Sequence, residues 1–222
     1  MSLTTDLTTR HASLWEAMVT HPFVIEMGDG TLPEAKFRAY FIQDFVFVRG
    51  LVKMVALGVS KAPGFAEASV LNRFLEGVLD PEGDLFERAF GAMGVSEEQY
   101  VSAVASPTTR AFGDFLVRTG HEGDFFDIAT VLFVTEGTYL DWGTRLISAG
   151  KSPDNAIYNE WITIHGPEVL GELVDWLRSH LDSADLSPAR ARRADELFLT
   201  TLRYEYMFWE AGERDWELGT GV

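Results

Sequence analysis

The stretch Tyr204-Glu205-Tyr206-Met207-Phe208-Trp209 sets one carboxylate among five large apolar or aromatic side chains. Reading outward from Glu205 at helical spacing gives a stripe on one face of a helix: Ala194, Leu197, Phe198, Thr201, Glu205 and Phe208. Glu205 is therefore expected to point into the core, where burial is costly for a carboxylate and raises its pKa. Such a residue is either a site candidate or a structural Glu hydrogen-bonded to a core Tyr or Arg.

A second carboxylate lies in similar surroundings. A long helix is predicted from Pro33 to Val59, and Asp44 lies on its apolar stripe. The other members of that stripe are Phe37, Tyr40, Phe41, Val48, Leu51, Val52 and Val55. Two inward acids among aromatic side chains predict a pocket for a flat polar molecule. Aromatic walls would hold its faces, and the carboxylates would accept hydrogen bonds from its edge N–H groups.

The acidic balance of the chain excludes several classes of partner. The net charge of −16 leaves no basic face for nucleic acid and disfavours an anionic membrane surface. The sequence has no run of 18 apolar residues, so no membrane span is predicted. The first residues lack the pattern of a signal peptide, and we therefore expect a cytoplasmic protein. The absence of cysteine excludes disulfides, Cys-ligated metals and a thiol nucleophile.

Helical periodicity runs through the chain, and we expect one all-α domain over residues 1–222 with about eight to ten helices. Thr31 is expected to cap the helix that opens at Pro33, and Asp80-Pro81 to begin another. Ser96 and Gln99 form a capping box. The other helices are expected over about 3–19, 65–78, 107–117, 124–146, 154–164, 167–181 and 188–212.

Six segments, taken in order, resemble the TenA family, also called thiaminase II. They are His21-Pro22-Phe23-Val24 with Gly28 to Pro33, Tyr40 to Phe45, Ser106 to Phe112, Thr135 to Tyr139, Tyr158 to Ile162, and Tyr204 to Trp209. The resemblance implies a haem-oxygenase-like all-α fold and, commonly, a homotetramer. It also implies a pocket for the aminopyrimidine half of thiamin. Typical members cleave thiamin, and they hydrolyse an aminopyrimidine to hydroxymethylpyrimidine and ammonia for thiamin salvage.

The resemblance also implies roles for individual residues. Asp44 falls where the family has an Asp that holds the pyrimidine edge, and Glu205 matches the catalytic Glu that exchanges a proton with the ring. Tyr139 and Phe208 match pocket residues. The pocket tyrosines of the family are replaced here by Phe47, Phe112 and His165.

The family nucleophile is a Cys, and Thr135 stands at its position in this chain. A thiolate attacks an electron-poor ring carbon, whereas a threonine hydroxyl needs a strong base beside it. We therefore expect hydrolysis of a salvage pyrimidine by water rather than covalent cleavage of thiamin. The alternatives are a non-catalytic pyrimidine-binding protein and a haem-oxygenase-like oxidase acting on another small molecule.

Several residues keep a second interpretation. Glu136 could reach the pocket and activate water, or it could point to solvent or pair with an Arg. Tyr139, Phe47, Phe112 and Phe208 could be core aromatics, and His165 a solvated residue at a helix end. Trp161 and Trp216 are possible interface residues.

No bound metal or organic cofactor is expected. The histidines are scattered and form neither Glu-x-x-His nor His-x-x-x-His spacing. The dinucleotide and phosphate-loop glycine motifs are also absent.

Overall fold

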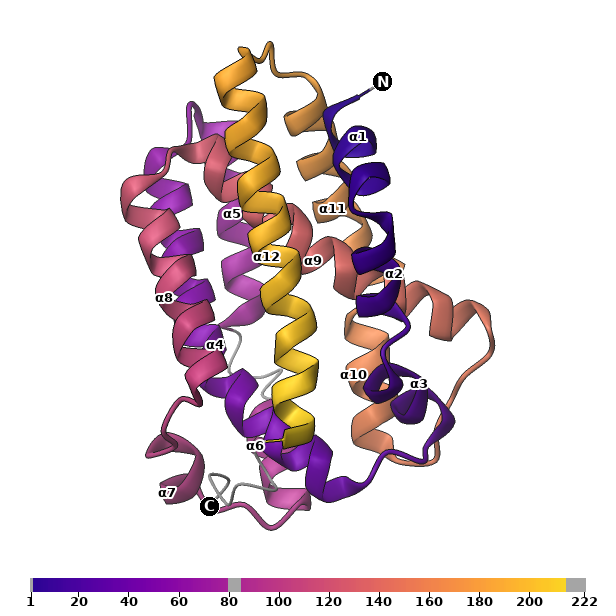
Figure 1. The fold of residues 1–222 in the computed structure, drawn as a ribbon. Helices are drawn as coiled ribbons and strands as arrows, with labels where there is room; N and C mark the ends of the chain where they lie inside the picture. Colours follow the sequence, from indigo (N-terminus) through magenta and orange to yellow (C-terminus); the bar gives the residue numbers. More distant parts are fainter. Residues whose placement is uncertain (1, 80–84, 215–222) are drawn as a thin grey trace. The chain divides into compact units, whose positions relative to one another are not determined.

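A computed structural model describes residues 2–79 and 85–214 of the chain. These residues form twelve α-helices and no strand, which confirms the all-α fold class (Figure 1). The helices are α1 Leu3–Arg10, α2 Ala12–Val19, α3 Pro22–Asp29, α4 Glu34–Lys61, α5 Phe65–Val78, α6 Leu85–Ala92, α7 Glu97–Val101, α8 Pro107–Glu122, α9 Phe125–Ser148, α10 Ala156–Ile164, α11 Pro167–Asp182 and α12 Pro188–Arg214.

The helices belong to two compact units. Unit 1 comprises Met1–Leu32 and Ala129–Tyr206, and unit 2 comprises Pro33–Ile128 and Met207–Val222. The boundaries fall inside α9 and α12, so each of these helices contributes to both units. The single domain over residues 1–222 stays a prediction.

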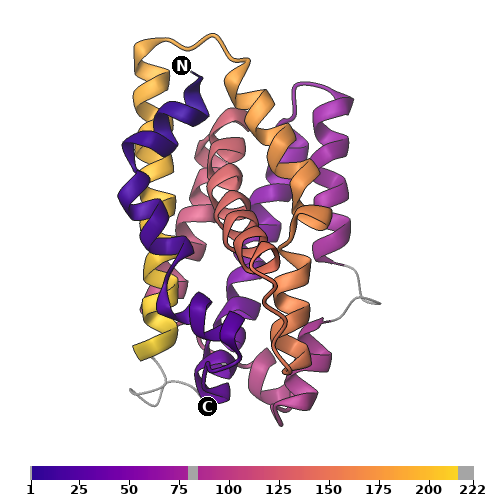
Figure 2. The same ribbon diagram turned by 90° about the vertical axis from the view of Figure 1, so that its right-hand side faces the viewer.

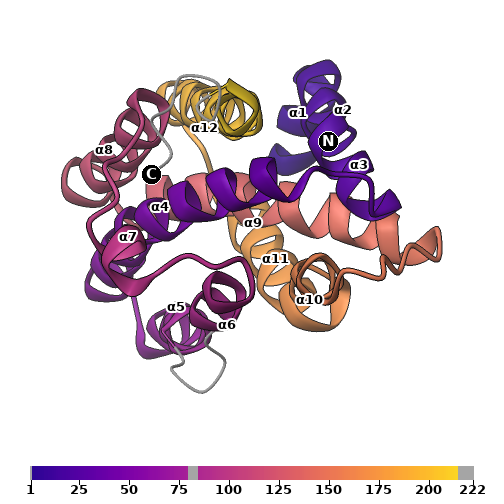
Figure 3. The same ribbon diagram turned by 90° about the horizontal axis from the view of Figure 1, so that it is seen from below.

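In unit 2, α4 packs against α8, α5 and α6, as Figure 3 shows from below. Gly50 of α4 and Gly113 of α8 allow a close approach, because a Cβ at position 50 would lie 3.1 Å from the Cα of Gly113. Helix α8 is capped by Ser106, whose side chain accepts a hydrogen bond from the backbone N–H of Thr109 at 3.1 Å.

In unit 1, α1 and α2 run beside the part of α12 that precedes residue 207 (Figure 2). The carboxylate of Asp182 accepts hydrogen bonds from the backbone N–H of Thr4 at 2.8 Å and from its hydroxyl at 2.9 Å, which ties α1 to the end of α11. Asp195 of α12 lies 2.7 Å from the guanidinium of Arg10 and 2.9 Å from Nε2 of His11.

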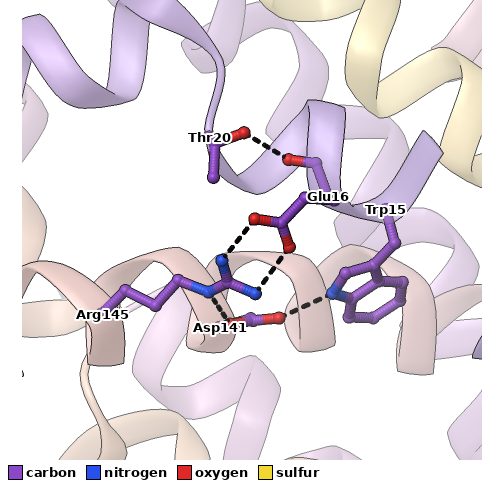
Figure 4. Close-up of polar contacts among 5 residues, drawn as sticks. All are labelled: Trp15, Glu16, Thr20, Asp141 and Arg145. Carbon is purple, nitrogen blue, oxygen red and sulfur yellow. Dashed lines mark hydrogen bonds and ion pairs between the residues drawn. The ribbon is translucent and has the colours of Figure 1, made fainter. Parts of the chain in front are cut away.

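Two consecutive residues of α2 hold α9 through polar contacts (Figure 4). Nε1 of Trp15 donates to Asp141 at 2.7 Å, and Nε of Arg145 donates to the other oxygen of Asp141 at 2.7 Å. Both terminal nitrogens of Arg145 donate to the carboxylate of Glu16, at 2.8 and 2.9 Å. A Cβ at Gly137 would lie 3.3 Å from the Trp15 ring. Positions 137, 141 and 145 share one face of α9, so α2 contacts this helix over two turns.

The expected helix over 3–19 is two helices. His11 interrupts it with φ −107° and ψ 20°, and ends α1 before α2 begins. The break accompanies two contacts of His11 with α12, the hydrogen bond to Asp195 and a ring contact with Phe198 at 5.7 Å. A pattern of local periodicity carries no information about these distant partners.

Helix α3 was not predicted from the sequence. Pro22 occupies the first turn of α3, where its missing N–H costs nothing. Nδ1 of His21 caps the helix by accepting from the N–H of Phe23 at 3.2 Å. Gly30 ends it with φ 71°, a left-handed conformation that favours glycine.

The prediction that Thr31 caps the next helix was wrong. Pro33 is the residue that precedes α4, and no side chain caps that end. The hydroxyl of Thr31 instead donates to the carbonyl of Glu26 at 3.4 Å, near the end of α3. The capping box of Ser96 and Gln99 is confirmed. Asp80-Pro81, expected to begin a helix, lies outside the described residues.

We predict that the Trp15→Phe variant loses about 1–3 kcal/mol of unfolding free energy, because it leaves an oxygen of Asp141 without its indole donor. Glu16→Gln is the matched control, since it weakens the neighbouring ion pair at side chains that are 44% and 56% exposed and should change stability by less than about 1 kcal/mol. Urea unfolding of both variants measures the difference. A larger loss in Glu16→Gln than in Trp15→Phe would contradict this ranking.

Candidate functional site

The predicted site residues fall into one group in each unit. Unit 1 holds Thr135, Glu136 and Tyr139 on α9, His165 directly after α10, and Glu205 on α12. Unit 2 holds Asp44 and Phe47 on α4, Phe112 on α8 and Phe208 on α12.

The two acids chosen from their helical stripes are both buried. Asp44 is 4% exposed and Glu205 is 3% exposed. The inward orientation predicted from periodicity is therefore confirmed for both carboxylates. Their roles in a reaction stay predictions.

Glu136 lies in the most deeply buried part of α9. Its side chain is 8% exposed, and Oε1 lies 3.2 Å from the hydroxyl of Thr135. Within residues 2–79 and 85–214, this is the one hydrogen bond of its carboxyl group. The interpretations in which Glu136 points to solvent or pairs with an Arg were therefore wrong. Burial raises the pKa of Glu136 to about 7, and the hydrogen bond from Thr135 opposes this rise only in part.

The Thr135 hydroxyl is close to two acceptors but has a single proton. It lies 3.1 Å from the carbonyl oxygen of Leu132 and 3.2 Å from Oε1 of Glu136. If Glu136 is ionised, its carboxylate competes with the carbonyl for that proton. If Glu136 is protonated, it can donate to the hydroxyl while the hydroxyl donates to Leu132, so every group is satisfied. The arrangement therefore suits a carboxyl group that gains and loses a proton near neutral pH.

Tyr139 and His165 meet in an aromatic cluster of unit 1. The imidazole lies 4.8 Å from the Tyr139 ring, 5.2 Å from the Trp142 ring and 4.4 Å from the Trp161 ring, measured between centroids. His165 does end a helix, but these rings leave it only partly exposed. Tyr139 lies one helical turn from Thr135 and Glu136, so the cluster continues from the Glu136 region along α9.

Unit 2 contains a triangle of phenyl rings at the predicted site positions. Phe47 lies 4.7 Å from Phe112 and 5.4 Å from Phe208, and Phe112 lies 6.5 Å from Phe208. Asp44 precedes Phe47 by three residues, so the two are neighbours on the surface of α4. The three phenylalanines therefore form one apolar group, next to a buried acid on the same helix.

Three tryptophan and aspartate side chains differ from what the sequence indicated. Trp15 and Asp141 were not predicted to form a contact, although Asp141 and Arg145 show the four-residue spacing of a helical ion pair. Trp161 was expected to be exposed at an interface, but it is 5% exposed and packs against His165. Trp216 lies outside the described residues.

No cluster of three or more His, Asp or Glu side chains that could hold a metal occurs in the part of the chain that the structure describes. Among the same residues, no helix has the length and apolar character that crossing a membrane requires.

Comparison with known proteins identifies the family. Residues 8–215 match the TENA/THI-4/PQQC family. The chain belongs to this family. An aminopyrimidine aminohydrolase of Halalkalibacterium halodurans is 29% identical over 220 residues, which cover 97% of this chain and 98% of the relative.

Solved structures of similar proteins support the same assignment. A TenA homologue from P. horikoshii superposes with a TM-score of 0.87 at 26% identity, covering 96% of this chain and 99% of the homologue. A domain with a heme oxygenase-like fold from Shewanella denitrificans has a TM-score of 0.75 at 15% identity, covering 99% of this chain and 96% of that domain. The expected haem-oxygenase-like fold of this family member is confirmed.

We predict that the unfolding free energy of Glu136→Gln, measured relative to wild type, is higher at pH 8 than at pH 4.5. The folded-state pKa of Glu136 is about 7 and its ordinary value is 4.5, so the folded state binds more protons between these values. The stability that this group supports is therefore greatest below pH 4.5 and falls as the pH rises to 7. The difference between the two ends approaches about 3 kcal/mol, at 1.36 kcal/mol per pKa unit.

Urea unfolding of both proteins across this pH range measures the effect. Glu172→Gln changes an exposed acid of α11 and is the matched control, for which no such pH-dependent gain is expected. A constant difference between Glu136→Gln and wild type at every pH would show that Glu136 has an ordinary pKa.

Proposed function

We propose that this protein is an aminopyrimidine aminohydrolase of thiamin salvage, acting on a 4-amino-5-aminomethylpyrimidine without a covalent enzyme intermediate. The substrate class is that of the aminopyrimidine aminohydrolase of Halalkalibacterium halodurans, which matches this chain over nearly its full length. The observation that carries the mechanism is Glu136, a buried carboxyl group with a pKa of about 7 beside the hydroxyl of Thr135.

The proposed reaction replaces the amine of the substrate's aminomethyl group with the oxygen of water. A carbon–oxygen bond forms, the carbon–nitrogen bond breaks, and the amine leaves as ammonia after gaining a proton. Glu136 in its ionised form takes a proton from the attacking water. A pKa near the working pH allows this group to accept a proton at one step and release it at another.

The other residues keep the roles that the family resemblance assigns to them. Asp44 accepts hydrogen bonds from the amino group of the pyrimidine, and Glu205 carries a proton between the ring nitrogen and the leaving amine. Tyr139, Phe208, Phe47, Phe112, Thr135 and His165 contact the substrate. The low exposure of Asp44 and Glu205 supports roles for both acids in a water-poor environment.

Thr135 supports a hydrolytic route over the covalent one. A threonine hydroxyl that is shared between a carbonyl and Glu136 is poorly suited to attack a ring carbon, whereas it can orient the carboxyl group. The presence of Thr135 in place of the family Cys also favours a second candidate function, a pyrimidine-binding protein without turnover. We further propose a cytoplasmic enzyme that acts as a homotetramer of single-domain chains.

We predict that the wild type releases ammonia from 4-amino-5-aminomethyl-2-methylpyrimidine and leaves thiamin intact. kcat should rise with pH around a midpoint near 7, because the ionised form of Glu136 is the active base. Glu136→Gln and Glu205→Gln should each lower kcat by about 10²- to 10⁴-fold, the range for loss of a general acid or base. Glu172→Gln is the control with an exposed acid and should retain full activity.

An enzyme-coupled ammonia assay over pH 5.5–9 measures these rates, at substrate concentrations on the order of 1 mM, the upper end of typical KM values. Saturable binding of the pyrimidine without turnover would overturn the hydrolase and favour the binding protein. Cleavage of thiamin at a comparable rate would overturn the route without a thiol nucleophile.

A further inference from the structure

His165 is held in one orientation at the end of α10. Its Nδ1 lies 2.7 Å from the carbonyl oxygen of Trp161, and the rings of Trp161, Tyr139 and Trp142 pack around it. The backbone of His165 also packs closely on α9, because a Cβ at Gly143 would lie 2.4 Å from the carbonyl oxygen of His165. The imidazole therefore has little freedom to turn.

The hydrogen bond to Trp161 determines where the imidazole carries its proton. A carbonyl oxygen can only accept a hydrogen bond, so Nδ1 must be the protonated nitrogen. Burial lowers the pKa of His165 to about 4, and the ring is consequently neutral at physiological pH. Nε2 is then a bare nitrogen whose lone pair can accept a hydrogen bond but cannot donate one.

Nε2 receives no hydrogen bond from residues 2–79 or 85–214. A partly desolvated acceptor of this kind is normally satisfied by water or by a ligand. Its neighbour Tyr139 lies one helical turn from Glu136, the base of the proposed hydrolysis. The bare nitrogen thus belongs to the same part of unit 1 as the proposed chemistry.

We propose that Nε2 of His165 accepts a hydrogen bond from an N–H or O–H group of the pyrimidine, and so makes this protein select ligands that carry a donor at the contacted position. The inference rests on the proposed function for the choice of a pyrimidine as the ligand. A tyrosine hydroxyl, which the family resemblance implies at this position, can donate as well as accept. His165 removes the donating option, so a ligand with only an acceptor there is rejected.

Three pyrimidines test the contact, together with two variants that separate the nitrogens of the imidazole. The parent ligand is 4-amino-5-hydroxymethyl-2-methylpyrimidine, the product of the proposed hydrolysis. One analogue carries a methoxymethyl group at position 5 and the other a dimethylamino group at position 4, so each lacks one donor. His165→Asn keeps a donor near Nδ1 but lacks Nε2, and His165→Gln supplies an acceptor near Nε2.

Isothermal titration calorimetry at pH 7.5 gives the Kd of each pyrimidine for the wild type and for each variant. In wild type, one of the two analogues should bind about 10-fold more weakly than the parent, the upper range for one net hydrogen bond. His165→Asn should bind the parent and that analogue equally weakly, so the preference disappears. His165→Gln should restore part of the preference. A merely structural role of His165 would weaken all three ligands alike.

The possible outcomes separate this inference from the proposed function. If each analogue loses the same affinity relative to the parent ligand in wild type and in His165→Asn, the contact is overturned, even if the wild type releases ammonia. A donor preference that His165→Asn removes would support the contact, even if no turnover occurs. A wild type that binds none of the three pyrimidines would overturn both proposals.

The protonation of His165 can be tested without any ligand. Imidazole ¹⁵N spectra of the free protein, assigned by comparison with His165→Gln, should show a protonated Nδ1 and a bare Nε2 at pH 7.5. A proton on Nε2 would overturn the inference directly.

Discussion

The burial of helix α9 is the constraint on which the chemistry of unit 1 depends. From Ala129 to Thr138 every side chain of this helix is buried, and several of them are polar. The threonine hydroxyls can donate hydrogen bonds to backbone carbonyls of the same helix, as Thr138 does to the carbonyl of Thr135 at 3.1 Å. Glu136 cannot satisfy itself in this way, so its environment favours the neutral carboxylic acid. The contacts that Trp15 and Glu16 of α2 make with Asp141 and Arg145 of this helix help to keep it in that buried position.

Burial shifts the pKa values of two titratable side chains near this part of α9 in opposite directions. Both shifts favour the neutral form of the side chain. Burial raises the pKa of Glu136 to about 7 and lowers that of His165 to about 4. Between about pH 4 and pH 7 neither side chain carries charge for most of the time, although the chain as a whole has a net charge of −16 at pH 7. A neutral, weakly basic aminopyrimidine is therefore compatible with this region. Its recognition would depend on hydrogen-bond direction rather than on ion pairing, as the fixed imidazole also suggests.

The sequence predicted those features that depend on local pattern. Helical periodicity and caps located most of the helices, and the stripe positions of Asp44 and Glu205 correctly indicated buried acids. The interruption at His11 was not predicted, because its partners Asp195 and Phe198 lie far away in the sequence. Helix α3 was not predicted, because the proline at its first position can either end a helix or begin one.

The candidate site was predictable as a set of residues but not as an electrostatic arrangement. Family resemblance pointed to Thr135, Tyr139 and His165, and periodicity left Glu136 undecided between solvent and the interior. Burial raises its pKa and the hydrogen bond from Thr135 opposes the rise in part, and neither effect can be evaluated from residue spacing. The direction of the His165 hydrogen bond depends on the backbone at Trp161, which a sequence motif does not show.

The central claim is that Glu136 exchanges its proton near neutral pH, and its titration tests this most directly. Protein labelled with ¹³C at glutamate side-chain carboxyl carbons would be followed by NMR from pH 4 to 9, with the Glu136 signal assigned from Glu136→Gln. We predict a midpoint near pH 7 for this one signal. A midpoint near the ordinary value of 4.5 would contradict it, because Glu136 would then be ionised throughout the physiological range and poorly suited to move a proton.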